Sequence, residues 1–194
     1  MPIFLFHGYG SSADTSYTVN AIEKVLYEVS HVDYGSIVRI DYPSTDFTAI
    51  HDIIEQQLDD SGVYTRPSEL IFIGTSFGAF WARYFANEYR GDALIMLNPQ
   101  LDPVLSMVEK VNNGELDSTL TEIRSLEDYY IITDDPTLPI TVVLGDFDAV
   151  VDPEIARATF QKRGNVVSVP DGHRLKITDE VAEVINSAVN SVIG

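Results

Sequence analysis

The sequence has 194 residues, of which 45% are apolar and 22% are charged, so the chain can bury a sizeable core and does not resemble a disordered protein. Its formal net charge of −18, from 30 acidic and 12 basic residues, argues against nucleic acids, anionic membrane surfaces and polyanionic substrates as partners. Cysteine is absent, which excludes disulfides, thiolate metal sites and cysteine nucleophiles.

We expect a single domain over residues 1–194, since no stretch reads as a linker between two domains. The apolar run in the N-terminal segment MPIFLFHGYG is too short for the core of a signal peptide, and no basic residue precedes it. No apolar span is long enough to cross a membrane. The sequence therefore predicts a cytoplasmic protein, and it gives no indication of the oligomeric state.

Six short runs rich in Ile, Val, Leu and Phe predict strands at 3–6, 37–40, 70–73, 93–97, 140–144 and 166–169. Segments with helical spacing of apolar residues are found at 17–29, 47–59, 78–89, 153–162 and 178–192. Because strands alternate with helices, we predict an α/β fold with a mostly parallel sheet of about six strands and helices on both faces. Residues 102–139 break the alternation and predict a small helical insertion with two helices, at 103–111 and 117–130.

Polar residues and glycines directly follow four of the predicted strands, in the segments HGYG (7–10), GTSFG (74–78), GDFD (145–148) and PDGH (170–173). In open parallel sheets, ligands bind beyond the carboxyl ends of the strands. A serine, an aspartate and a histidine from distant parts of the sequence are therefore expected to meet at this edge.

Gly74, Ser76 and Gly78 form a GxSxG pattern between a predicted strand and a predicted helix. The glycines let the backbone turn sharply and the helix approach the strand, which exposes the Ser76 hydroxyl at the tip of the turn. The following helix directs its N-terminus at the same place, so the Phe77 amide can donate to a developing oxyanion. We therefore predict that Ser76 is a nucleophile. The alternative is a glycine-rich turn with an incidental serine.

A serine nucleophile needs a base, and His173, after the last predicted strand, is the candidate. A neutral imidazole can accept the serine proton and later pass it to the leaving group. The alternative for a single loop histidine is a solvated turn residue. We expect His7 to shape its loop by hydrogen bonding, and we expect His31 and His51 to be surface residues.

Three aspartates compete for the role of orienting His173. We favour Asp148, and Asp146 is the main alternative because it follows the same strand. Asp152 precedes a proline and is expected to cap the next helix, and Asp171 is expected to be a turn residue.

The resulting chain order, Ser76 then Asp148 then His173, is one of the known convergent orders of serine hydrolases, different from the chymotrypsin and subtilisin orders. The HGYG segment after the first strand then has a role, since the Tyr9 amide can supply the second oxyanion donor.

The chain resembles the α/β-hydrolases, and within them the small YqiA-like esterases (the UPF0227-type uncharacterised family), in the stretches FLFHGYGSS, IGTSFGAFWARYFANEY, LNPQLDP, GDFDAVVD and DGHR. These stretches run from residue 4 to residue 174. The resemblance implies an esterase that acts on carboxylic esters through an acyl-enzyme, with no metal or organic cofactor. It also implies a reduced α/β-hydrolase fold, because the chain begins directly with the HGYG strand where larger members have two earlier strands.

The expected partner is a small-molecule ester of short to medium length, with Tyr9, Phe77 and Phe147 as candidate substrate-binding side chains. Phe80 and Trp81 lie close by in the sequence, but packing against the sheet is at least as good an explanation for them. Two alternatives to an esterase are a thioesterase or amidase with the same triad, and a non-catalytic binding protein that keeps the fold.

Overall fold

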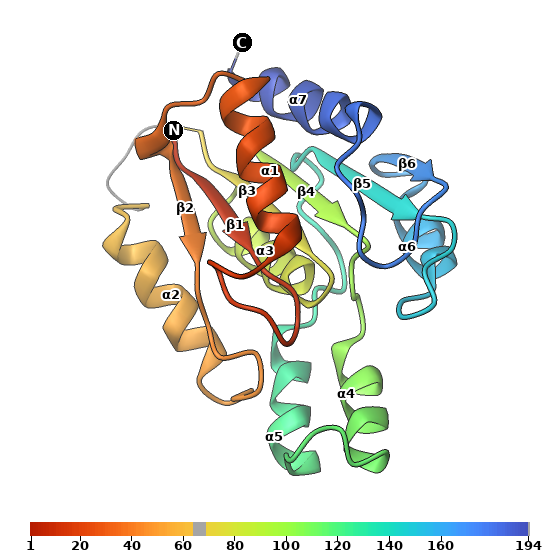
Figure 1. The fold of residues 1–194 in the computed structure, drawn as a ribbon. Helices are drawn as coiled ribbons and strands as arrows, with labels where there is room; N and C mark the ends of the chain where they lie inside the picture. Colours follow the sequence, from red (N-terminus) through yellow and green to blue (C-terminus); the bar gives the residue numbers. More distant parts are fainter. Residues whose placement is uncertain (64–68, 194) are drawn as a thin grey trace.

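The computed structural model describes residues 1–63 and 69–193 and contains all six predicted strands (Figure 1). They are β1 (Ile3–Phe6), β2 (Ile37–Ile40), β3 (Ile71–Thr75), β4 (Ala93–Leu97), β5 (Ile140–Gly145) and β6 (Asn165–Val169). The strands form one sheet in the order β2-β1-β3-β4-β5-β6, and every neighbouring pair is parallel. The predicted fold class is confirmed.

Helices cover both faces of this sheet (Figure 1). Those on one face are α1 (Tyr17–Glu28) and α7 (Asp179–Ile193), and those on the other are α2 (Ile50–Asp60), α3 (Phe77–Glu88) and α6 (Pro153–Phe160). A short 3₁₀ turn at Tyr34–Ser36 leads into β2. Within the described residues, no helix is both long enough and apolar enough to cross a membrane.

The insertion between β4 and β5 extends past the carboxyl ends of the strands (Figure 1). Its first helix, α4 (Pro103–Asn112), matches the prediction, and the Asp102 carboxylate caps its N-terminus. The predicted second helix is shorter than expected: α5 covers only Leu120–Arg124, and the chain then tightens into a 3₁₀ turn over Ser125–Tyr129. A capping box between Thr119 and Glu122 fixes the start of α5 and thus removes the preceding residues from the helix.

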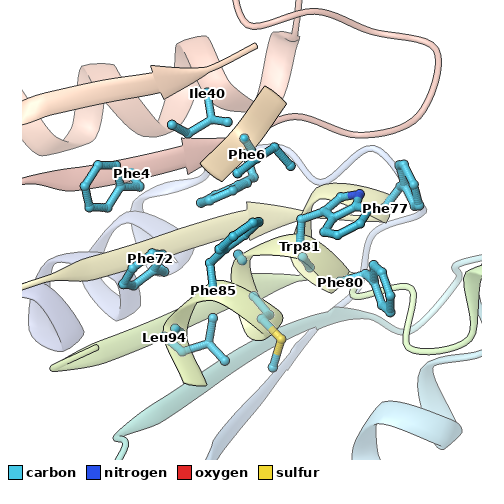
Figure 2. Close-up of a cluster of buried hydrophobic side chains, with 14 of the residues drawn as sticks. Phe4, Phe6, Ile40, Phe72, Phe77, Phe80, Trp81, Phe85 and Leu94 are labelled. Atoms are coloured by element: carbon cyan, nitrogen blue, oxygen red, sulfur yellow. The ribbon is translucent and has the colours of Figure 1, made fainter. Parts of the chain in front are cut away.

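The core divides into two layers because successive strand residues point to opposite faces. Ile3 and Leu5 of β1 face α1 and α7, whereas Phe4 and Phe6 face a layer rich in aromatic rings against α2 and α3. Figure 2 shows this aromatic layer, in which the Trp81 side chain is fully buried. The four central strands are buried along their whole length, as their continuous apolar sequences predict.

A buried ion pair ties the insertion to helix α3. The Arg83 guanidinium donates to both carboxylate oxygens of Asp134, at 2.8 and 2.9 Å, and the two side chains are only 10% and 7% exposed. Asn87 adds a hydrogen bond of 3.1 Å to the same carboxylate. This bidentate geometry fixes the segment that returns from the insertion to β5.

We predict that Asp134→Asn lowers the free energy of unfolding by about 3 kcal/mol, because it leaves the buried Arg83 charge without a counter-ion. Urea unfolding followed by circular dichroism measures the change. Asp128→Asn is the control, since Asp128 is exposed in the same insertion and its substitution should cost less than about 0.5 kcal/mol. Equal effects of the two substitutions would contradict this account of the ion pair.

Candidate active site

Ser76 joins β3 to α3 in a strained backbone conformation, with φ 53° and ψ −121°. Three backbone hydrogen bonds hold it there: the Ser76 amide donates to the Leu97 carbonyl at 2.9 Å, and the Ser76 carbonyl accepts from Ala79 at 3.0 Å and Gln100 at 3.1 Å. Such strain in a residue other than glycine persists only where the surroundings enforce it.

The two glycines of the GxSxG pattern are required by close backbone contacts. A Cβ at Gly74 would lie 2.5 Å from the Gly78 carbonyl oxygen, and a Cβ at Gly78 would lie 2.3 Å from the His7 carbonyl oxygen. Both distances are far below van der Waals contact, so helix α3 can approach β1 and β3 this closely only with glycine at both positions.

The structure brings Ser76, Asp148 and His173 into one hydrogen-bonded chain. Ser76 Oγ lies 2.9 Å from His173 Nε2, and His173 Nδ1 lies 2.8 Å from Asp148 Oδ2. An ionised carboxylate can only accept, so Nδ1 carries the imidazole proton and Nε2 is left to accept from the serine hydroxyl. The side chain of Asp148 is 1% exposed and that of His173 is 23% exposed, which leaves the serine end of the chain open to solvent.

Of the competing aspartates, only Asp148 reaches His173. Its second carboxylate oxygen accepts from the amides of Val150 and Val151, at 2.8 and 2.9 Å, which fixes its orientation. Asp146 instead pairs with Arg157 at 3.2 Å.

The other two aspartates have the structural roles predicted for them. Asp152 caps helix α6 by accepting from the Glu154 amide. Asp171 accepts from the amides of Lys176 and Gly172, and these hydrogen bonds lower the pKa of its carboxyl group.

Asn98, to which the sequence analysis gave no role, fastens the histidine loop to the sheet. It follows β4, is 2% exposed and has a positive φ of 44°. Its side-chain amide donates to the carbonyls of Gly172 and His173, at 3.0 and 2.9 Å, and its side-chain oxygen accepts from the Gly145 amide at 2.7 Å. A polar residue at the carboxyl end of an otherwise apolar strand was the signal that could have identified it.

The open side of Ser76 faces a polar cleft of about 260 Å³. We call it the polar cleft; it is lined by the loop that follows β1, the first turn of α1, Thr75, Ser76, His173 and Arg174. The loop passes directly over the serine, because a Cβ at Gly8 would lie 3.4 Å from the Ser76 Cβ. Tyr9 is the next residue and therefore lies at the mouth of the site. The Phe77 amide is the first of helix α3, so it has no acceptor within that helix.

A second groove of about 220 Å³ is lined by residues that follow β4 and residues near the start of α6, and by no member of the triad. We call it the apolar groove; its walls include Leu101 and Leu105 of the insertion, and Val151 and Ile155 near the start of α6. Two residues of this groove, Gln100 and Val151, donate backbone hydrogen bonds to Ser76 and Asp148 respectively. Leu105 and Ile155 are 61% and 56% exposed, so the groove is open to solvent.

The prediction of an aromatic substrate pocket is wrong for the Phe77 side chain, and Phe147 does not line the polar cleft. The Phe77 ring is 1% exposed and packs against Phe80 and Trp81 in the core (Figure 2). Phe47 also contacts this ring. Phe147 is 71% exposed. Only Tyr9 lies where it was expected, and the first turn of α3 directs Phe77 into the sheet instead of the site.

His7 is fully buried beside the site and shapes its loop, as expected. Its Nδ1 lies 2.9 Å from the Gly8 carbonyl oxygen, and its ring stacks on Tyr42 at a centroid distance of 4.1 Å. His31 is exposed, but His51 is not a free surface residue, since its side chain is only 16% exposed and stacks on Tyr129.

Burial lowers the pKa of His7, although hydrogen bonds and the nearby Asp41 carboxylate act in the opposite direction. An unfolded chain therefore binds a proton at His7 more readily than the folded one, and the free energy of unfolding falls as pH drops below about 6.5. We predict that His7→Asn removes this contribution, which amounts to at most about 1.4 kcal/mol per pH unit. Urea unfolding at pH 7.5, 6.5 and 5.5 measures it.

His31→Asn is the matched control, since the exposed His31 has a positive φ of 53° that asparagine tolerates. It should keep the wild-type pH dependence. An unchanged pH dependence in His7→Asn would show that the histidine does not stay neutral in the folded protein.

Among the residues described, the one group of three side chains that could hold a metal ion is His51, Asp52 and Glu55 on α2. It includes no member of the Ser76 site. Asp52 already lies 3.0 Å from the His51 ring nitrogen.

Comparison with known proteins identifies the family of the chain. A family model described as "Uncharacterised protein family (UPF0227)" matches residues 2–189. The chain belongs to this family. No curated protein sequence matches the chain.

Solved structures show that this UPF0227 member has the α/β-hydrolase fold. The mouse alpha/beta hydrolase domain-containing protein 10 has a TM-score of 0.74 at 16% identity, over 99% of this chain and 89% of that one. Est1E from Butyrivibrio proteoclasticus has a TM-score of 0.74 at 18% identity with ferulic acid bound, over 100% and 90% of the two chains. An esterase from Pyrococcus furiosus has a TM-score of 0.71 at 12% identity, over 100% and 82%. At these identities the likeness extends to the fold alone.

Proposed function

We propose that the protein is a serine esterase that hydrolyses short to medium carboxylic esters through an acyl-enzyme. The observation that carries this proposal is the hydrogen-bonded chain from Ser76 Oγ through His173 to Asp148, at 2.9 and 2.8 Å. It starts from a serine in a strained turn at the carboxyl end of β3. The α/β-hydrolase fold and the esterases among its structural neighbours support the same chemistry by analogy.

In the proposed reaction, Ser76 Oγ attacks the ester carbonyl carbon while His173 Nε2 takes the hydroxyl proton. The imidazolium that forms is stabilised by the buried Asp148 carboxylate. His173 then gives its proton to the leaving alkoxide as the carbon–oxygen bond breaks. Water then attacks the acyl-enzyme while His173 Nε2 takes one of its protons. His173 passes this proton to Ser76 Oγ as the bond between Oγ and the acyl carbon breaks, and the carboxylic acid leaves.

The backbone amides of Phe77 and Tyr9 are the proposed oxyanion donors. The Phe77 amide lies at the N-terminus of α3, where the helix dipole favours negative charge. Tyr9 comes from the loop over Ser76, so the two donors would approach the carbonyl oxygen from different strands. All groups needed for the reaction come from the chain itself, so the proposal requires no cofactor.

The two recesses beside Ser76 suggest how an ester would bind. An ester has two halves joined at the carbonyl. Ser76 lines the polar cleft of about 260 Å³, and Gln100, whose amide donates to the Ser76 carbonyl, lines the apolar groove of about 220 Å³. We propose that one half of the substrate occupies each. These volumes are small for ligand sites, which favours short chains over long lipids.

We predict that the protein hydrolyses p-nitrophenyl esters and that Ser76→Ala lowers kcat/KM by at least about 10³-fold, because the variant lacks the nucleophile. Across esters from acetate to decanoate, kcat/KM should be highest at six carbons or fewer. Release of p-nitrophenol gives both quantities.

Ser187→Ala is the control, since Ser187 is an exposed serine on α7 away from the triad. The Ser187→Ala variant should hydrolyse every ester at the wild-type rate. Turnover that survives in Ser76→Ala would contradict the proposal, and so would a wild-type protein that hydrolyses none of the esters.

A further inference from the structure

Arg174, the residue after His173, lines the polar cleft together with Ser76. Its side chain is exposed, and within residues 1–63 and 69–193 it has neither a hydrogen bond nor an ion pair. Arg39, Arg83 and Arg157 each pair with a carboxylate, as expected where acidic residues outnumber basic ones by 30 to 12. Arg174 therefore offers an unpaired guanidinium at the cleft that Ser76 also lines.

The polar cleft lacks negative charge in a strongly acidic protein. Neither aspartate nor glutamate is among the described residues that line it, although the chain contains 30 of them. Asp14, in the loop over the cleft, is not one of its lining residues. Nearby Lys110, which lies 5.4 Å from the Tyr9 ring centroid, is paired with Glu115. Arg174 is thus the only fixed charge that lines the described part of the cleft.

The uncharged residues that line the cleft also favour a polar or negatively charged group of the ligand. Hydroxyl residues such as Ser11 and Thr15 line the cleft, so its walls can solvate a polar group in place of water. The first turn of α1 also lines it, and the amide groups there carry partial positive charge of the same sign as the guanidinium. A hydrophobic half of an ester would gain little from such walls.

We infer that the substrate is an ester that carries a carboxylate, and that Arg174 binds this group and so determines specificity. The inference rests on the esterase function proposed above and names its substrate class. A guanidinium donates two parallel hydrogen bonds to a carboxylate, which makes it a selective partner. A phosphate dianion is a weaker candidate, because the net charge of −18 repels two negative charges about twice as strongly as one.

The test compares matched anionic and neutral esters, with the charge placed in each half of the molecule in turn. For the alcohol half, the pair is 4-acetoxybenzoate and 4-acetoxybenzamide. For the acyl half, it is mono-p-nitrophenyl adipate and p-nitrophenyl hexanoate. The ratio of kcat/KM for the anionic ester to kcat/KM for the neutral ester is measured in each variant, so that the intrinsic reactivity of the esters cancels between variants.

In at least one pair, Arg174→Gln should lower this ratio by about tenfold or more, the loss expected when a charge-assisted hydrogen bond is removed. Arg174→Lys should recover part of the ratio, since it keeps the charge but not the bidentate geometry. Lys162→Gln is the control for net charge. Lys162 follows the C-terminal end of α6 and does not line the cleft, so its substitution removes one positive charge and should leave the ratio unchanged.

The outcomes separate the two proposals. If the wild-type protein hydrolyses the neutral esters through Ser76 and Arg174→Gln leaves both ratios unchanged, the carboxylate inference is wrong and the esterase function stands. If Lys162→Gln lowers the ratios as much as Arg174→Gln, the effect comes from net charge, and the assignment to Arg174 is wrong. If no ester is hydrolysed, both proposals fail together.

Discussion

Ser76 keeps its positive φ because the sheet, the insertion and helix α3 all bond to its backbone. Its amide donates to Leu97 at the end of β4, and its carbonyl accepts from Gln100 and Ala79. Gly74 and Gly78 allow the helix close enough for this, since any side chain there would overlap neighbouring backbone atoms. The rest of the site depends on this turn, because it sets the position of the Ser76 hydroxyl relative to loops that come from β1, β5 and β6.

Those loops are held to the sheet by polar groups that are buried or partly buried. Asn98 bonds to the loops that carry Asp148 and His173, so it links the ends of β4, β5 and β6. The strand order also matters, since β1 and β3 lie next to each other although β2 separates them in sequence. The polar cleft opens at this point of the sheet, where parallel α/β proteins commonly bind ligands. Its lining thus combines residues from both ends of the chain around one serine.

Much of this arrangement could be predicted from the sequence, because it follows from strand periodicity. The residues after four predicted strands, Ser76, Asp148, His173 and Tyr9, are those that the structure gathers at one edge. Periodicity does not set side-chain direction in the first turn of a helix, so the burial of Phe77 was missed. Nor does it indicate which distant polar groups pair, so the hydrogen-bond partners of Asn98 and the unpaired state of Arg174 could not be foreseen, although the position of Asn98 after an apolar strand marks it as a candidate. The late start of α5 depends on the capping box at Thr119, which competes with the helical pattern of the residues before it.

The most direct test of an activated serine is the rate at which a fluorophosphonate modifies the protein. Nucleophilic attack by Ser76 Oγ on phosphorus expels fluoride, and His173 accelerates this step by taking the hydroxyl proton. The account predicts one label per chain, located on Ser76 by peptide mass spectrometry, and a rate at least about 10²-fold lower in His173→Gln. A label on another residue, no label at all, or an equal rate in the two proteins would contradict it.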